Sequence, residues 1–332
     1  YPGMIYKSSG AIASYWAKII GEKLYELTWQ ATWPIEKAVI HAKNEKINII
    51  STEPIGQVIS QPKLEYHLYL DIRDDCILHL RKYITTKEVE ELVKKFDYII
   101  GADGVTSRVA KYLGVEIPKD EIFRCVEYWI THEPKKTLHV FFEEYCPGGY
   151  IWVIPEWGKI KVGLGIPMTR RENLEEILRK FLHEHKDFAG HVFRKVFRLV
   201  PSPTPLPSVV FDGKIALVGD AGRTVNPATG GGIHLAALSG YMAGKSLAEA
   251  GDFSLYEEYY RQEIYPELEK WHKIKKVLYK LSIDELAEVI KTLGKTIMVP
   301  EPLNPRLERD KILKFILKHP KLAIKIGREL IA

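Results

Sequence analysis

The residues best suited to chemistry in this sequence lie at positions 214–235, where an apolar run leads into a series of glycines. The segment reads Lys-Ile-Ala-Leu-Val-Gly-Asp-Ala-Gly-Arg-Thr-Val-Asn-Pro-Ala-Thr-Gly-Gly-Gly-Ile-His-Leu. Its apolar start predicts a buried strand, which delivers Gly219 and Asp220 to its carboxyl end. Open α/β sheets bind their ligands at this edge. A carboxylate there can accept hydrogen bonds from sugar-like hydroxyl groups.

The second half of this segment favours a flat, polar ligand. Gly230, Gly231 and Gly232 let the backbone approach a ligand without a clash at Cβ. A helix beginning at Ile233 would direct its N–H groups and the positive end of its dipole toward that ligand. Pro227 offers a rigid apolar face to a flat ring. The alternative is a glycine-rich turn before a buried helix.

A similar pattern occurs about 115 residues earlier. The apolar run at 96–100 predicts a buried strand, and it ends in Gly101, Asp103 and Gly104. Alone, this Gly-Ala-Asp-Gly sequence is equally well explained as an ordinary turn. Its pairing with the segment at 214–235 makes a shared ligand site the more specific interpretation.

A third segment carries aromatic residues at strand spacing. Tyr150, Trp152 and Ile154 alternate with other residues, so on a strand they share one face. Such a face could line an apolar tunnel, or it could be an aromatic strand of an ordinary core.

The composition limits the classes of protein in which these motifs could function. The 332 residues are 46% hydrophobic and 27% charged, with a net charge of +5, which does not by itself imply a nucleic-acid partner. No apolar run approaches the ~18 residues of a membrane-crossing helix. Cys76, Cys125 and Cys146 lack the spacing of a zinc site, so we expect no metal and a reducing cytoplasmic setting. Abundant Lys, Glu and Ile with few Cys and Met hint at a thermophile.

Hydrophobic periodicity predicts the elements that position the motifs. Strands separated by hairpin-like turns fill 122–166 and predict an antiparallel sheet. The pattern further predicts strands at 37–41 and 46–50, helices at 62–72 and 172–185, an extended segment at 201–207, and almost wholly helical structure over 253–332.

Together these motifs resemble those of the FAD-dependent, p-hydroxybenzoate-hydroxylase-like superfamily. The segment Cys146-Pro-Gly-Gly-Tyr-Ile-Trp-Val-Ile-Pro further resembles the Pro-Gly-Gly-Tyr-x-Trp-x-Phe-Pro segment of geranylgeranyl reductases. The resemblance implies FAD as the cofactor, with Asp220 at the ribityl chain and 230–233 at the pyrimidine edge of the flavin. It also implies that Gly101, Asp103 and Gly104 lie near the pyrophosphate.

The sequence departs from the family pattern at several positions. Ile154 stands where the family has Phe, and Glu156 stands where a basic residue is usual. Ser9 occupies the position of a cysteine that touches the flavin, and Ser60-Gln61 replaces an Asp-Arg pair. Ala110 stands where Arg is common. Ser9, Gln61 and Ala110, together with a missing glycine motif, leave open a degenerate, non-catalytic relative that binds a lipid or a protein partner.

The resemblance implies an α/β fold with a discontinuous Rossmann-like FAD domain, an antiparallel-sheet substrate domain and a helical C-terminal region. The expected boundaries are 1–18, 60–117 and 200–252 for the FAD domain, 19–59 and 118–199 for the substrate domain, and 253–332 for the helical region. We find no Gly-x-Gly-x-x-Gly segment, which the resemblance would place ~40 residues before Tyr1. The sequence is therefore either incomplete at this end or degenerate, and the well-kept motifs favour incompleteness.

The activity implied by the resemblance is the saturation of C=C bonds in an isoprenoid chain, such as the geranylgeranyl groups of archaeal ether lipids. Reduced flavin would deliver a hydride to one alkene carbon, and a proton would reach the other. Tyr150 is the candidate for positioning or proton supply, and Trp152 would shape the tunnel. An external electron donor, NAD(P)H or a redox protein, is expected. A flavin-dependent monooxygenase is the alternative that shares both flavin motifs.

The C-terminal residues 311–328 alternate apolar and basic residues at helical spacing. One interpretation is an amphipathic surface that rests on anionic lipid, which would make a cytoplasmic protein peripheral to the membrane. The other is a pair of ordinary helices, broken at Pro320, with lysines facing water.

Overall fold

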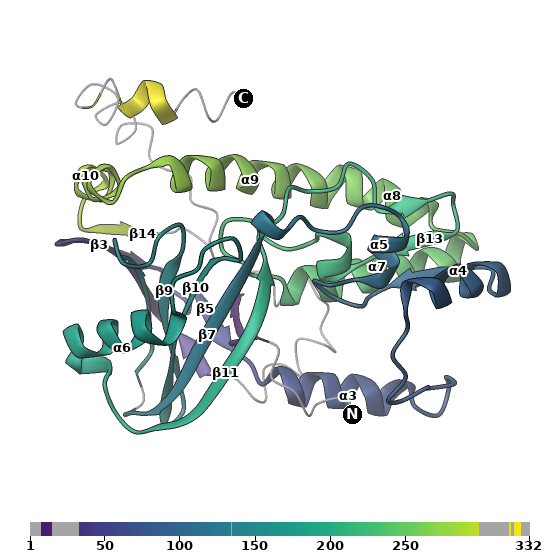
Figure 1. The fold of residues 1–332 in the computed structure, drawn as a ribbon, viewed down its shortest axis with the longest axis horizontal. Coiled ribbons are helices and arrows are strands. Elements are labelled where there is room, and N and C mark those ends of the chain that lie inside the picture. Colours follow the sequence, from purple (N-terminus) through teal and green to yellow (C-terminus); the bar gives the residue numbers. More distant parts are fainter. Residues whose placement is uncertain (1–7, 15–32, 134, 299–318, 320–321, 327–332) are drawn as a thin grey trace. The chain divides into compact units, whose positions relative to one another are not determined.

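The computed structural model describes residues 8–14, 33–133, 135–298, 319 and 322–326, and these form a mixed α/β fold (Figure 1). The predicted fold class is confirmed. The chain divides into two compact units: unit 1 holds 72–123 and 199–275, and unit 2 holds 2–71, 124–198 and 276–332. Both units are discontinuous in sequence. The domain boundaries expected from the sequence stay a prediction, and their parts at 1–7 and 15–32 lie outside the described residues.

Unit 2 is built on an eight-stranded sheet. Its strands, in spatial order, are β11 (Val192–Pro201), β7 (Ile122–Thr131), β10 (Lys159–Pro167), β9 (Tyr150–Glu156), β8 (Thr137–Phe142), β3 (Lys37–Ala42), β4 (Glu45–Ile50) and β14 (Thr296–Met298).

The pairing in this sheet is antiparallel between β8, β9 and β10, as predicted for 122–166. Two other pairs run parallel, β3 with β8 and β4 with β14. The prediction of an almost wholly helical region after residue 253 is therefore wrong at β14. Its residues complete the backbone hydrogen bonds of β4, and this long-range pairing overrides the local helical pattern.

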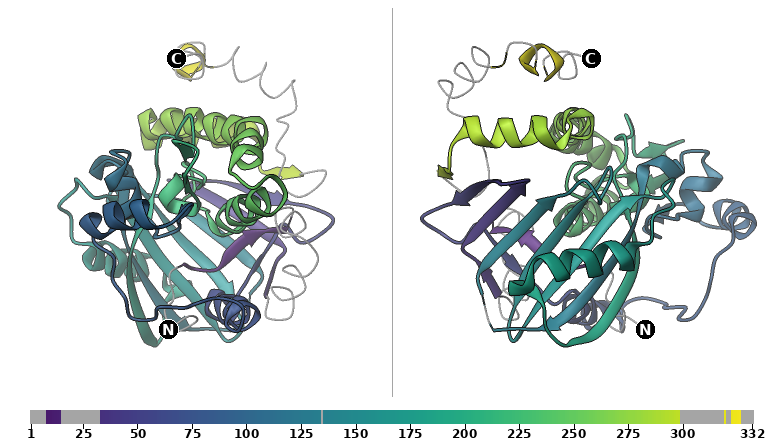
Figure 2. Two further views of the ribbon diagram at one scale, coloured as in Figure 1. Left: turned by 90° about the vertical axis from the view of Figure 1, so that its right-hand side faces the viewer. Right: turned by 60° about the vertical axis from the view of Figure 1, so that its left-hand side comes forward.

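One face of the large sheet packs against α6 (Leu174–Glu184), which lies across its strands (Figure 2). The helix begins at Asn173, whose side chain accepts hydrogen bonds from the N–H groups of Glu175 and Glu176. Leu178 and Phe181 are fully buried among the alternate residues of β7, β9 and β10. Since α6 covers this face, the side chains at the other alternate positions point to the opposite face.

The opposite face of the large sheet meets a three-stranded sheet of order β1 (Ala11–Ala13), β5 (Gly56–Val58) and β2 (Trp33–Ile35). Ile35, Ile55 and Val58 of this small sheet form a buried cluster with Ile154 of β9. The aromatic face of β9 therefore lies inside unit 2 rather than in open solvent.

Unit 1 holds a second three-stranded sheet, of order β12 (Val210–Phe211), β13 (Ile215–Leu217) and β6 (Ile99–Gly101). Strand β13 is fully buried in the centre, as predicted. Strand β6 lies at the edge, and Ile100 is 39% exposed. The prediction of a buried strand at 96–100 is thus wrong in extent and burial, because the strand begins at Ile99 and Phe96 and Tyr98 before it are 46% and 40% exposed. Among the described strands, β13 is the one that pairs with β6, so the other edge of β6 is left uncovered.

Several helices complete the two units. They are α3 (Gln61–Ile72), α4 (Thr86–Lys95), α5 (Arg108–Tyr112), α7 (Ile233–Ala250), α8 (Ser254–Tyr259), α9 (Tyr265–Lys280) and α10 (Ile283–Leu293). Helix α4 was not predicted from the sequence, although Thr85 and Glu88 form a capping box at its start. None of the described helices combines the length and apolar composition that a bilayer crossing needs.

Two histidines on adjacent strands of the large sheet form a pair. The Nε2 of His41 lies 3.1 Å from the Nδ1 of His139, and the His41 ring stacks on Phe141 with 4.1 Å between ring centroids. Burial, together with neighbouring positive groups, lowers the pKa of each histidine from 6.5 to about 4. The folded protein therefore holds both rings neutral at mild acidity.

This pair should make the protein sensitive to acid. A histidine whose folded pKa is lowered contributes stability that is fully present above about pH 6.5 and is lost as the pH falls toward 4. Replacing His41 with Phe keeps the stacking on Phe141 and removes one titrating ring. We expect the loss of unfolding free energy between pH 7.5 and 4.5 to shrink by on the order of 1 kcal/mol. Chemical denaturation at both pH values measures this, and exposed His79→Phe should leave the pH dependence unchanged.

Candidate active site

The two glycine–aspartate segments predicted from the sequence meet at one edge of the unit 1 sheet. Strands β6 and β13 pair in parallel, with Gly101 opposite Leu217, and the N–H of Val218 donates to the carbonyl of Gly101 over 3.0 Å. The carboxyl ends of neighbouring parallel strands lie at the same edge of a sheet. The loops that carry Asp103 and Asp220 therefore leave the sheet side by side.

The loop after β13 is a tight turn, Gly219–Gly222, fixed by hydrogen bonds to α7. Gly219 has a φ of +57°, and its N–H donates to the hydroxyl of Ser239 over 3.0 Å. The hydroxyl of Thr224 donates to the carbonyl of Gly219 over 2.9 Å. A Cβ at Gly219 would lie 3.2 Å from that of Ala236, so glycine permits both the turn and the close helix.

The Asp220 carboxylate emerges from this turn half-buried and unsatisfied. No residue in the described part of the chain donates a hydrogen bond to it. Burial without a compensating partner raises the pKa of Asp220 from 3.8 to about 6. Its Oδ1 lies 3.3 Å from where a Cβ of Gly232 would stand, next to the start of α7. A carboxylate in this state suits a ligand that brings hydrogen-bond donors, such as hydroxyl groups.

The start of α7 is also without a side-chain partner. Its N-cap is Gly232, and no side chain caps the helix in the described residues. Gly230 has a φ of +69°, and its N–H donates to the carbonyl of Asn226 over 2.8 Å. Because no described side chain caps this turn, its N–H groups lie where the sequence predicts an anionic or polar ligand.

The segment before these glycines is held in a compact turn. The Asn226 side chain accepts from the N–H groups of Ala228 and Thr229. Pro227 is buried, and its carbonyl accepts a hydrogen bond of 2.6 Å from Ser202. The turn fixes Gly230, Gly231 and Gly232, together with Ile233, as one rigid element.

Asp103 differs from Asp220, because its carboxylate already has partners. It accepts hydrogen bonds of 2.5 Å from the hydroxyl of Ser107 and from the N–H of Arg108, at the start of α5. Asp103 itself is exposed. Gly104, with a φ of +80°, has open space around the position of a Cβ, whereas a Cβ at Gly101 would lie 2.7 Å from Leu217. Asp103 thus stabilises the loop, and a cofactor role for it stays a prediction.

The predicted aromatic residues lie on the face of the large sheet that α6 leaves uncovered. Trp152 stands opposite Gly163, and Tyr150 stands opposite Gly165 on β10. A Cβ on Gly163 would lie 2.5 Å from the Trp152 ring, so the indole lies directly over the glycine. Two glycines opposite two large rings give this face an aromatic surface, on which the Tyr150 and Trp152 rings meet edge to face with an interplanar angle of 63°.

The environment of Tyr150 bears on its two expected roles. Its ring lies 5.9 Å from that of Trp152 and 6.1 Å from that of Phe142, measured between centroids. Burial raises the pKa of Tyr150, with Tyr279 and two buried cysteines adding to the shift. The phenol is therefore a weak acid that keeps its proton, and this environment favours positioning over proton supply.

A buried carboxylate on the same face was missed by the sequence analysis. Glu127 of β7 is 0% exposed and accepts hydrogen bonds from the indole nitrogens of Trp129 and Trp152, each over 2.9 Å. It also accepts from the hydroxyl of Ser9 and from Arg198 over 2.8 Å. The signal was present in the sequence, because a single acid inside the apolar run 122–130 is buried only with partners.

A second buried charge lies beside Glu127. Lys161 is 2% exposed, pairs with Glu156 over 2.7 Å and donates to the carbonyl of Ser9 over the same distance. Burial lowers the pKa of Lys161, against the attraction of Glu156 and Glu127. Glu156, a departure from the family pattern, thus compensates a buried lysine. A buried cation needs such a partner.

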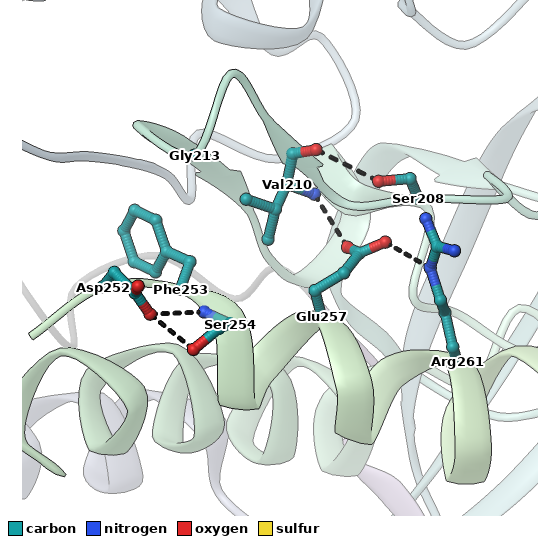
Figure 3. Close-up of a pocket in the computed structure, with 8 residues that line it drawn as sticks. All are labelled: Ser208, Val210, Gly213, Asp252, Phe253, Ser254, Glu257 and Arg261. Atoms are coloured by element: carbon teal, nitrogen blue, oxygen red, sulfur yellow. Dashed lines mark hydrogen bonds and ion pairs between the residues drawn. The ribbon is translucent and has the colours of Figure 1, made fainter. Parts of the chain in front are cut away.

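The one pocket that Figure 3 shows lies elsewhere in unit 1 and has a volume of about 270 Å³. It is lined by Ser208, Val210, Gly213, Asp252, Phe253, Ser254, Glu257 and Arg261. Glu257 accepts from the N–H groups of Val209 and Val210 and from Arg261. Asp252 accepts from Ser254. Both carboxylates are satisfied within the protein, Glu257 by the backbone at β12 and Asp252 at the start of α8, so they stabilise the fold rather than offer a ligand site.

The fold has close structural counterparts among flavin-dependent enzymes. A geranylgeranyl bacteriochlorophyll reductase-like protein from Thermoplasma acidophilum superposes with a TM-score of 0.76 at 19% identity, covering 98% of this chain and 90% of that protein. HpxO from Klebsiella pneumoniae, solved with FAD and uric acid, superposes with a TM-score of 0.59 at 14% identity, covering 87% and 84%. The chain therefore has the fold of FAD-dependent enzymes.

Sequence comparison narrows this class. Residues 121–198 match the family model of the geranylgeranyl reductase catalytic domain. The chain is 34% identical over 227 residues to a digeranylgeranylglycerophospholipid reductase of Methanocaldococcus jannaschii, covering 63% of this chain and 57% of the relative. A second such reductase, from Methanosphaerula palustris, is 31% identical over 268 residues, covering 74% and 63%.

The chain belongs to the geranylgeranyl reductase family, and the predicted resemblance is confirmed. The matched region spans less than two thirds of the length of these relatives. The matched catalytic-domain residues include Glu127, Tyr150, Trp152 and Lys161, all on the aromatic face of the sheet.

The two aspartates should respond in opposite ways to the same substitution. The raised pKa of Asp220 means that its ionised form costs stability above about pH 6, and this cost is absent below about pH 3.8. Asp220→Asn should therefore raise the unfolding free energy at pH 8, by up to about 3 kcal/mol. Asp103→Asn should lower the unfolding free energy by about 0.5–2 kcal/mol. The substitution replaces one accepting oxygen with an NH₂ group, which cannot accept the hydrogen bonds that Ser107 and Arg108 donate.

Denaturant titration of cofactor-free protein measures both effects. Repeating the Asp220→Asn titration near pH 4 provides the control, because the gain should disappear there. A loss of stability in Asp220→Asn at pH 8 would show that the carboxylate has a partner in the folded protein.

Proposed function

We propose that this protein is an FAD-dependent reductase that saturates C=C bonds in the isoprenoid chain of a prenyl lipid. The observation that carries the proposal is the unsatisfied Asp220 carboxylate beside the uncapped start of α7, in a member of the geranylgeranyl reductase family. The relatives named above are reductases of digeranylgeranylglycerophospholipid. An archaeal ether-lipid precursor is therefore the substrate that we propose.

The residues present fit FAD. Among the described residues none donates a hydrogen bond to the half-buried Asp220 carboxylate, and the ribityl chain of FAD carries hydroxyl donors. Gly230, Gly231 and Gly232 leave room for a flat ring to approach the backbone, and the N–H groups that follow Ile233 would face its polar edge. Gly219 and Pro227 hold this element in place. Bound FAD would supply the hydride for the reduction.

The chain itself would bind and orient the substrate. Tyr150 and Trp152, opposite Gly165 and Gly163, form an angled aromatic wall, which suits an isoprenoid chain without polar groups. Trp152 is partly buried against the cluster that β9 forms with the small sheet, and this apolar packing limits the access of water to its ring. The contribution of these residues is thus alignment of the alkene and exclusion of solvent.

Two features of the proposal concern partners. An external donor, NAD(P)H or a redox protein, would supply the electrons that reduce the flavin. Contact with the membrane through the basic, apolar residues 311–328 would give access to a lipid substrate. Most of that segment lies outside the described residues, so its sequence pattern alone supports this contact.

The proposal is tested with the full-length gene product. Purified protein should be yellow or bind added FAD, and after anaerobic reduction it should convert a digeranylgeranylglycerophospholipid to products heavier by one H₂ for each saturated bond. Mass spectrometry of the lipid measures this. Asp220→Ala should weaken FAD binding by about 10- to 100-fold, the effect of losing hydrogen bonds worth about 1–3 kcal/mol.

Other outcomes would overturn the proposal. An oxygenated product formed with consumption of O₂ would indicate a flavin-dependent monooxygenase. A colourless protein that cannot be reconstituted with FAD would indicate a non-catalytic lipid- or partner-binding relative.

A further inference from the structure

Glu127 joins four separate segments of unit 2 through one buried carboxylate. Its Oε1 accepts from Trp129 on the same strand and from Arg198 on β11. Its Oε2 accepts from Trp152 on β9 and from Ser9 at the start of the described chain. Each oxygen thus has two donors, which is the full capacity of a well-satisfied carboxylate.

The charge of Glu127 is stabilised despite complete burial. Burial would raise the pKa of Glu127, but Arg198, Lys161 and the donors from Ser9 and Trp129 outweigh it and hold the pKa below its ordinary value. The side chain of Arg198 is itself 7% exposed. The carboxylate therefore stays ionised, and its hydrogen bonds to the two indoles are charge-assisted and directional.

The Trp152 indole is fixed from two sides. Its Nε1–H is held by Glu127 over 2.9 Å, and its ring lies over Gly163, where a Cβ would come within 2.5 Å of Cζ2. An indole has two side-chain torsions, and a hydrogen bond at one edge plus contact on one face leaves neither of them free. The remaining edge meets Tyr150 at 5.9 Å between centroids.

We propose that Glu127 is a positioning residue, which together with Gly163 sets the orientation of the Trp152 indole in the wall of the prenyl-chain site. This inference rests on the proposed function and deepens it. Trp152 contacts the isoprenoid chain, and Glu127 acts through Trp152. Turning the indole would change the angle between the Trp152 and Tyr150 rings and so weaken the alignment of the chain.

Trp129 provides a matched control within the same network. It donates to the same carboxylate over the same 2.9 Å, but to the other oxygen and from β7. Its ring is buried at 4% exposure beneath Lys159, Lys161 and Arg194. If Glu127 only stabilised the sheet, loss of either indole donor would have similar consequences. If Glu127 positions Trp152, lipid affinity should depend on the hydrogen bond that Trp152 donates to Glu127 and not on the one that Trp129 donates.

The first measurement follows the indole N–H resonances of full-length protein labelled with ¹⁵N. Trp129→Phe and Trp152→Phe assign the two signals. Glu127→Gln should shift both, because the amide cannot accept from four donors. Gly163→Ala should shift the Trp152 signal and leave the Trp129 signal in place, since its methyl group displaces one ring without touching the carboxylate.

The second measurement is the dissociation constant of a digeranylgeranyl lipid for the FAD-bound, oxidised protein, without turnover. Glu127→Gln and Gly163→Ala should each weaken lipid binding on the order of tenfold, with FAD affinity unchanged. Trp129→Phe should bind lipid like the wild type. In a Trp152→Phe background, Glu127→Gln should have no further effect on lipid affinity.

The outcomes separate the two proposals. Lipid binding without reduction would refute the reductase function and leave the positioning test intact. Unchanged lipid affinity in Gly163→Ala, despite a shifted Trp152 signal, would overturn the positioning role, and so would an additive effect of Glu127→Gln in the Trp152→Phe background. Gly163→Ala keeps the test decisive if Glu127→Gln does not fold. Absence of any lipid binding by the wild type would overturn both proposals.

Discussion

The parallel pairing of β6 with β13 is the interaction on which the cofactor half of the structure depends. It brings two loops that lie over 100 residues apart in sequence to one edge of a sheet. Glycine at position 219 then turns the chain so that Asp220 faces the start of α7. The result is a carboxylate and a helix start that both lack partners in the described part of the chain. Folded proteins leave such groups unsatisfied where a ligand completes them.

The proposed cofactor site in unit 1 and the aromatic face in unit 2 follow different physical rules. In unit 1 the polar groups are left incomplete, which favours a polar ligand and costs stability in its absence. In unit 2 the polar groups around Glu127 are complete, and the side chains that remain for a ligand are aromatic. Complete polar networks are rigid because each member holds the others. An apolar chain with no polar groups of its own is best aligned by such a rigid surface.

Two of the departures from the family pattern, Ser9 and Glu156, make polar contacts within this network. Ser9 donates to Glu127 through its hydroxyl, so the residue at the family cysteine position is tied to the aromatic face. Glu156 pairs with the buried Lys161, whose ammonium also binds the carbonyl of Ser9. These contacts give both departures a structural reason. They weaken the argument that the chain is degenerate, because a decayed network would leave buried charges unpaired.

The sequence by itself determined the elements and motifs whose cause is local. Alternation and turn residues predicted the strands of 122–166, and the glycine run before Ile233 predicted the start of α7. Tertiary structure alone decided the contacts between segments distant in sequence. The exposure of Ile100, the strand at Thr296–Met298 and the four donors of Glu127 all depend on which neighbours the fold supplies. The physical reason is that the spacing of apolar residues in the sequence shows which face of a strand or helix each side chain occupies. Burial and hydrogen bonding depend instead on what packs against that face in the folded protein.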